Sequence, residues 1–107
     1  MLMTFATYVP VDYSPEAFKA KRLNYGLHRI SIELIGAREH VLNTLAVHNG
    51  IVRKLAAQHE GVLFVDQASL MAAEPRYFND VSHLTVVGSL KFAENLLAVL
   101  LPNLRGG

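Results

Sequence analysis

The sequence contains no cysteine and little charge, and both shortages limit what the protein can do. Without cysteine the chain can form no disulfide, no thiolate metal site and no cysteine nucleophile, so its stability has to come from packing. The 10 basic and 9 acidic side chains leave a formal charge of +1 and are scattered along the chain. Because they form no basic stripe, no nucleic-acid partner is expected.

Long apolar runs are also missing. Residues 96–101 form the longest run near the C-terminal end, but Pro102 follows them, and about 20 residues are needed to span a bilayer. No transmembrane segment is therefore expected. Residues 1–6 lack the basic flank and the cleavage site of a secretory signal, and we interpret them as part of a strand.

Motifs for bound metals and nucleotides are not present either. The seven glycines form neither G-x-G-x-x-G nor a P-loop, so no nucleotide site is expected. The histidines other than His83 are spaced too widely to converge on zinc, and we interpret them as solvated or capping residues. They are His28, His40, His48 and His59.

What is present is the composition of one globular domain, with 107 residues of which 51% are hydrophobic and 18% charged. Residues 2–9 are apolar on both alternating faces, which predicts a central strand of a parallel sheet that ends at Pro10. Residues 62–66 form a second apolar run and predict a second strand, which ends in the carboxylate of Asp66. No linker divides the chain.

Two helices are predicted between these strands. Ser14-Pro15-Glu16 is a capping sequence that starts a short helix to about Leu23, and Gly26 can supply its left-handed stop. Apolar residues at helical spacing predict a long helix over residues 38–59, although Gly50 lies inside it.

A third helix is predicted near the C-terminal end. Thr85 is well placed to cap it, and Pro102 with the terminal glycines closes it off. We interpret residues 25–36 and 71–82 as loops. The final helix passes through Val86, Leu90, Ala93, Leu97 and Leu100.

The order of these elements is strand, helices, strand, loop, helix, which corresponds to one right-handed crossover unit with a trailing helix. It predicts an α/β fold: a partial flavodoxin-like, doubly wound parallel sheet with three layers (α/β/α). Two strands are few for such a sheet. We therefore interpret residues 1–107 as the C-terminal half of a domain whose sequence begins partway through.

Asp80 and His83 form the pair with the clearest chemical meaning. They lie three residues apart, between the second predicted strand and the last predicted helix. A serine hydrolase needs a histidine that takes the proton of its nucleophile and a carboxylate that fixes the tautomer of the ring. On spacing alone the signal is weak, because Asp-x-x-His occurs often by chance and is more typical of a surface loop or of a helix entry.

The surroundings of this pair resemble the final motif block of the SGNH/GDSL-type hydrolases. The matching residues are an apolar strand ending in Val65-Asp66, a loop, Asp80-x-x-His83-Leu84-Thr85, and Gly88 in an apolar helix. Leu2-Met3-Thr4 is similar to a central strand of that family, and residues 48–56 are similar to its helix before the last strand.

The resemblance implies a flavodoxin-like sheet, hydrolysis of a small-molecule ester or acylated substrate, and no cofactor. Asp80 would orient the ring, and His83 would act as general base and then as general acid. The chain departs from the family in the earlier motif blocks. The Gly-Asp-Ser tripeptide with the nucleophilic serine is missing, and the glycine and asparagine of the oxyanion hole cannot be placed.

The five serines of the chain have other interpretations, and Gly88-Ser89-Leu90 lacks the aspartate of the family motif. The chain is therefore expected to be inactive alone. The serines are Ser14, a helix cap, Ser31, in the first predicted loop, Ser69, after the second strand, Ser82, beside His83, and Ser89.

Two other functions are consistent with the sequence. A truncated sheet would expose its first strand, which predicts a non-catalytic interaction module that dimerises or complements an N-terminal half. A flavodoxin-like binder of a small ligand would share the architecture, but the chain lacks a phosphate-binding loop.

Overall fold

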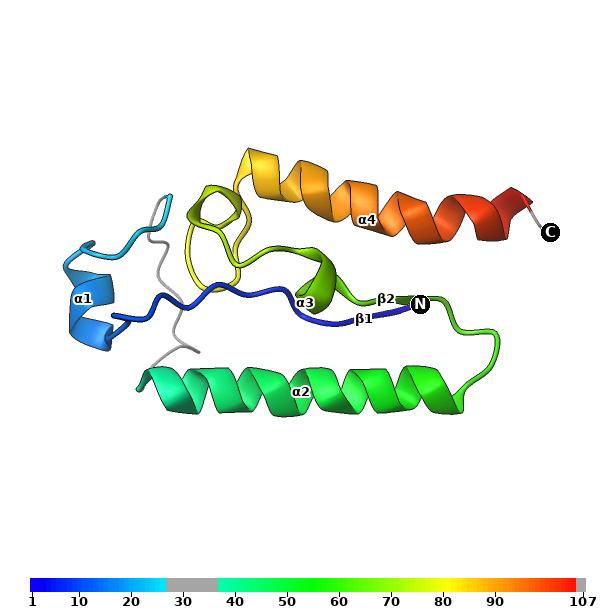
Figure 1. Cartoon of the computed structure of the whole chain (residues 1–107), viewed down its shortest axis with the longest axis horizontal. Coiled ribbons are helices and arrows are strands. Elements are labelled where there is room, and N and C mark those ends of the chain that lie inside the picture. Colours follow the sequence, from blue (N-terminus) through cyan, green and yellow to red (C-terminus); the bar gives the residue numbers. More distant parts are fainter. Residues whose placement is uncertain (27–36, 106–107) are drawn as a thin grey trace.

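The computed structural model describes residues 1–26 and 37–105, and most of these residues are helical (Figure 1). The short strands β1 (Leu2–Met3) and β2 (Phe64–Val65) pair in parallel. The long helices α2 (Arg38–Gln58) and α4 (Val86–Arg105) lie on opposite sides of this pair. The remaining elements are α1 (Pro15–Lys19), α3 (Gln67–Leu70) and the 3-10 helix η2 (Pro75–Tyr77).

The prediction of a flavodoxin-like, doubly wound sheet is wrong. Within the described residues the sheet has two strands of two residues each, so no three-layer α/β/α architecture forms. The apolar runs over residues 2–9 and 62–66 are longer than the strands they contribute. A strand is defined by backbone partners, and apolar side chains alone do not supply them.

From Phe5 on, the backbone that follows β1 finds its hydrogen-bond partners outside the sheet. The side-chain amide of Asn49, on α2, accepts a hydrogen bond from the N–H of Phe5 at 2.7 Å and donates one to the carbonyl of Phe5 at 3.1 Å. Farther along, the N–H of Tyr8 donates to the carbonyl of Val81 at 3.0 Å. These contacts hold the segment from Phe5 to Tyr8 in place without a pairing strand.

Helix α1 begins as the capping sequence predicts, because the hydroxyl of Ser14 accepts a hydrogen bond from the N–H of Ala17 at 3.0 Å. It ends earlier than predicted, and the residue with a left-handed backbone is Lys21, at φ 56°, rather than Gly26. Gly26 has a different role: a Cβ atom there would collide with the side-chain oxygen of Asn79. Most of the predicted loop over residues 25–36 lies outside the described residues.

The two long helices confirm the predicted ones, with one correction at the C-terminal end. The hydroxyl of Thr85 caps α4 by accepting a hydrogen bond from the N–H of Gly88 at 3.0 Å. Helix α4 continues through Pro102, which was expected to close it. Gly88 also lets α4 pack closely on η2, because a Cβ atom there would collide with the carbonyl oxygen of Tyr77. In the described part of the chain, no helix combines the length and the apolar character that crossing a membrane requires.

The hydrophobic core lies toward the end of the molecule that holds α1, η2 and the start of α2 (Figure 1). Its tyrosine and phenylalanine rings meet at centroid distances of 5.5 to 6.4 Å. The buried side chains are Val9, Tyr13, Ala17, Leu23, Tyr25, Val41, Met71, Tyr77, Phe78 and Val81. The core therefore packs against the loop that carries Asp80.

Replacement of Asn49 tests how much its contact with the backbone of Phe5 stabilises the fold. We expect Asn49→Ala to lower the free energy of unfolding by about 2 kcal/mol, because two backbone groups lose their partner at a site where Asn49 is only 6% exposed. Urea unfolding followed by circular dichroism measures the change. Asn43→Ala, at an exposed position of the same helix, is the matched control. Equal stabilities of the two variants would contradict the assignment.

Candidate acid-base site

The loop over residues 78–85 closes on itself and thereby positions the candidate pair. Phe78 and Leu84 form an antiparallel bridge at its base. The backbone N–H of Asn79 donates to the carbonyl of His83 at 2.7 Å, and its side-chain amide donates to the carbonyl of Leu84 at 3.2 Å. These contacts close the base of the loop, so the side chains between them have little freedom.

Asp80 points into the protein from this loop and is fully buried. One of its carboxylate oxygens accepts hydrogen bonds from the N–H groups of Ser82, at 3.0 Å, and His83, at 2.8 Å. The Nδ1 atom of His83 lies 2.9 Å from both carboxylate oxygens. The structure thus brings Asp80 and His83 into direct contact, and hydrogen bonds compensate the buried carboxylate.

The His83 side chain, in contrast, is 55% exposed. A carboxylate at Nδ1 favours the tautomer that carries its proton on this nitrogen, which leaves Nε2 able to accept a proton. A partly exposed imidazole oriented by a buried carboxylate could act as a general base toward a group that reaches Nε2.

A buried tyrosine supports the loop from behind. The carbonyl of Val81, the residue after Asp80, accepts a hydrogen bond from Tyr8, and the hydroxyl of Tyr25 donates to the carbonyl of Tyr8 at 2.6 Å. Burial raises the pKa of Tyr25 far above its usual value, and the neighbouring Tyr13, Tyr8 and Asp80 raise it further. Tyr25 therefore remains a hydrogen-bond donor over the whole physiological range.

None of the serines in the described part of the chain donates a hydrogen bond to the ring of His83. Ser14 caps α1, as predicted, and the hydroxyl of Ser69 donates to Asp66 at 2.8 Å. Ser89 is exposed on α4. Ser31, like His28, lies outside the described residues.

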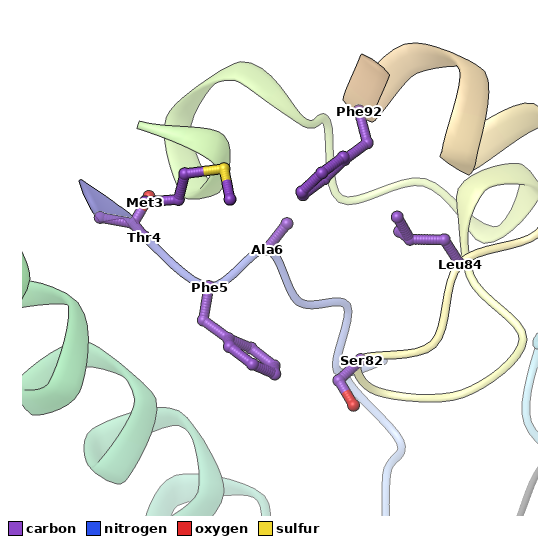
Figure 2. A pocket seen from close by; sticks show the side chains of 7 residues that line it. All are labelled: Met3, Thr4, Phe5, Ala6, Ser82, Leu84 and Phe92. Carbon is purple, nitrogen blue, oxygen red and sulfur yellow. The ribbon is translucent and has the colours of Figure 1, made fainter. Parts of the chain in front are cut away.

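An apolar pocket of about 260 Å³ opens beside this loop. Figure 2 shows it between the segment of residues 3–6, the start of α4 and the loop that holds Ser82. The only polar residues in its lining are Thr4 and Ser82, and the Thr4 hydroxyl is already engaged with Asp66 at 2.6 Å. The pocket therefore has an apolar wall with one available hydroxyl, on the residue next to His83.

Asp66 directly follows β2, where the sequence predicts a functional edge, but other side chains of the protein already donate hydrogen bonds to its carboxylate. Arg53 donates to it from two nitrogens, at 3.0 and 3.2 Å, and Thr4 and Ser69 donate through their hydroxyls. The hydrogen bonds from Arg53, followed by those from Thr4 and Ser69, lower the pKa of Asp66 to about 2. This cluster connects α2 and α3 with the residue that follows β1. Ser69 is only three residues from Asp66, but Thr4 and Arg53 are more distant in sequence and could not be predicted from local spacing.

No three side chains of the kinds that ligate metals come together within residues 1–26 and 37–105. Comparison with protein-family models, with curated proteins and with solved structures found no match to this chain. The resemblance to SGNH/GDSL-type hydrolases therefore stays a prediction from the residues, and the sheet that it implies is absent from the described structure.

The tautomer of His83 is the first test of the site. In the neutral ring we expect the proton on Nδ1, because the Asp80 carboxylate accepts it, whereas a free imidazole prefers the proton on Nε2. Long-range ¹H–¹⁵N correlation spectra distinguish the two tautomers. The exposed His59 serves as the internal control. A proton on Nε2 of His83 that Asp80→Asn leaves unchanged would contradict the assigned geometry.

The Asp66 cluster predicts a stability that depends on acidity. The pKa of Asp66 is lower in the folded protein, at about 2, than its ordinary value of 3.8. Its contribution is therefore complete above pH 3.8 and is lost as the pH falls toward 2. We expect Asp66→Asn to cost about 1 kcal/mol at pH 6, since the pair with Arg53 is partly solvated, and to cost much less near pH 2.5.

Unfolding of both proteins in urea at each pH measures this difference. Glu94→Gln, which alters an exposed carboxylate with a weak partner at 4.0 Å, is the control for a general effect of charge. A cost of Asp66→Asn that is the same at both pH values would show that the carboxylate does not act through its ionisation.

Proposed function

We propose that this chain supplies the base and its orienting acid to a serine hydrolase of the SGNH/GDSL type that acts on an ester or acyl group. In this proposal His83 takes the proton of the nucleophile and later returns it to the leaving group, while Asp80 fixes the tautomer and stabilises the imidazolium. The proposal rests on the pair and its loop, and it does not depend on a flavodoxin-like sheet.

The observation that carries the proposal is the contact between a fully buried carboxylate and a partly exposed ring. Asp80 has no solvent exposure and meets Nδ1 of His83 at 2.9 Å through both oxygens. A surface ion pair would leave both groups solvated and mobile, and it would contribute little. The hydrogen bonds to Asp80 from Ser82 and His83 backbone groups orient the carboxylate before any substrate binds.

The proposal requires two components from outside the described residues. A nucleophilic serine must approach Nε2 of His83, and donors must stabilise the developing oxyanion, each worth roughly 3 to 4 kcal/mol. The apolar pocket beside Ser82 offers a place for the acyl group. We therefore propose that another polypeptide segment completes the site, and that the chain alone has little activity.

Hydrolysis of an activated ester, p-nitrophenyl acetate, tests the reactivity of the His83 ring without the missing serine, because Nε2 of an accessible imidazole attacks this ester directly and water then releases the acetyl group. We expect His83→Ala to remove most of the histidine-dependent rate, because its Nε2 is exposed and its Nδ1 is held by Asp80. Asp80→Asn should lower the rate severalfold through the wrong tautomer. His59→Ala removes an exposed histidine at the end of α2 and should change the rate little. If the His83 and His59 variants hydrolyse the ester equally, the proposed role of His83 is wrong.

The missing nucleophile is tested by a fluorophosphonate probe and intact-mass analysis. No adduct is expected on the folded chain alone. A serine adduct that disappears in His83→Ala would place the nucleophile within this chain, and peptide mapping would identify it. Such a result would retain the base but overturn the requirement for a second segment.

A further inference from the structure

Helix α4 is apolar on two opposite faces, although the body of the molecule covers only one. The inner face includes the buried Gly88 and Asn95, and Asn95 donates a hydrogen bond to the buried Gln67 at 3.0 Å. The outer face holds large apolar side chains with high exposure: Val86 79%, Leu90 62%, Leu97 48%, Leu101 43% and Leu104 73%. A broad apolar face on a helix is normally covered by another part of a protein.

The outer side chains follow a seven-residue repeat. Leu90, Leu97 and Leu104 recur at intervals of seven, and a second set recurs at the same interval four residues before them. Together they form what we call the α4 seam: Val86, Leu90, Ala93, Leu97, Leu100 and Leu104. This spacing is that of the a and d positions of a coiled coil, which pack against a facing helix.

We propose that the α4 seam is a homodimer interface, and that two copies of the chain pack α4 against α4 in antiparallel orientation. In this orientation each side chain of the seam lies opposite a side chain of the seam in the second copy. Val86 meets Leu104, Leu90 meets Leu100, and the small Ala93 meets Leu97. The same patch serves both copies, as a twofold interface requires.

The antiparallel orientation fits the sizes of the side chains better than the parallel one. Parallel packing would place the two Ala93 side chains in one layer and would leave a gap there. It would also align the two helix dipoles, whereas antiparallel packing opposes them. The only charged side chains between residues 86 and 104 are Lys91 and Glu94, which pair with each other at 4.0 Å. In the antiparallel dimer the two Glu94 carboxylates lie near each other across the twofold axis, and the Lys91 that pairs with Glu94 in each copy offsets their repulsion.

The exposed area of the seam is sufficient for a dimer. Its side chains and the adjoining Leu101 expose on the order of 600 Å² per copy, so two copies would bury about 1,200 Å², which is the lower end of the range for specific interfaces. An apolar patch of this size is at the upper end of what a monomer typically exposes, and such patches are often functional. The exposed face of α2 is less suitable, because Lys54 lies among its apolar residues Val47, Ile51 and Leu55.

Sedimentation equilibrium of the full chain between about 1 µM and 1 mM tests the proposal. We expect a monomer–dimer equilibrium, and we expect Leu97→Glu, at the centre of the seam, to raise the dissociation constant at least tenfold. Val47→Glu introduces the same charge at an exposed position of α2 and should leave it unchanged. Circular dichroism verifies that both variants fold. A monomeric wild type, or a Leu97→Glu variant that dimerises as the wild type does, would overturn the proposal.

The absence of cysteine allows the orientation to be tested by single substitutions. In the antiparallel dimer, position 94 lies near its own copy across the twofold axis, so Glu94→Cys should form a disulfide-linked dimer under mild oxidation. Position 90 lies opposite Leu100 of the second copy, so Leu90→Cys should form none. A linked dimer of Leu90→Cys without one of Glu94→Cys would establish parallel packing and overturn the antiparallel arrangement. If neither variant forms a disulfide-linked dimer, the interface lies outside the α4 seam.

Discussion

The carboxylate of Asp80 has no access to solvent, and a charge in that position is stable only where hydrogen bonds replace its hydration. The loop over residues 78–85 satisfies this constraint with two backbone N–H groups and the ring of His83. The same requirement fixes the residues around it. Val81, directly after Asp80, is buried and receives the backbone of Tyr8, so the carboxylate, the aromatic core and the segment after β1 are positioned together.

The local part of the candidate site could be predicted from the sequence. Asp80 and His83 are only three positions apart, and a loop allows their side chains to meet, as they do at 2.9 Å. The support from Tyr25 and the burial of Asp80 could not be predicted, because they depend on chain segments more than fifty residues away. The proposed function of the pair rests on that burial, so spacing alone favoured a surface loop or a helix entry.

The fold, like the candidate site, could be predicted from the sequence only where it depends on neighbouring residues. Capping signals at Ser14 and Thr85 act within a few residues and located the starts of α1 and α4 correctly. Strand pairing depends on distant partners, and here Asn49 on α2 bonds the backbone of Phe5, within the segment that was predicted to continue as a strand. Periodicity identified α4 as a helix but did not indicate which of its apolar faces would lie inward. The inner face contains the polar Asn95, which no measure of hydrophobicity would select.

The contact between Asn49 and Phe5 also protects the molecule against misassembly. A strand edge with free backbone groups can recruit the same edge of another molecule, and this is how many proteins begin to aggregate. At Phe5 both backbone groups already have a partner in the side chain of Asn49, which is anchored on a long helix. An approaching chain would have to displace that amide before it could extend the sheet. A single buried amide thus occupies the backbone groups through which another chain could extend the sheet at Phe5.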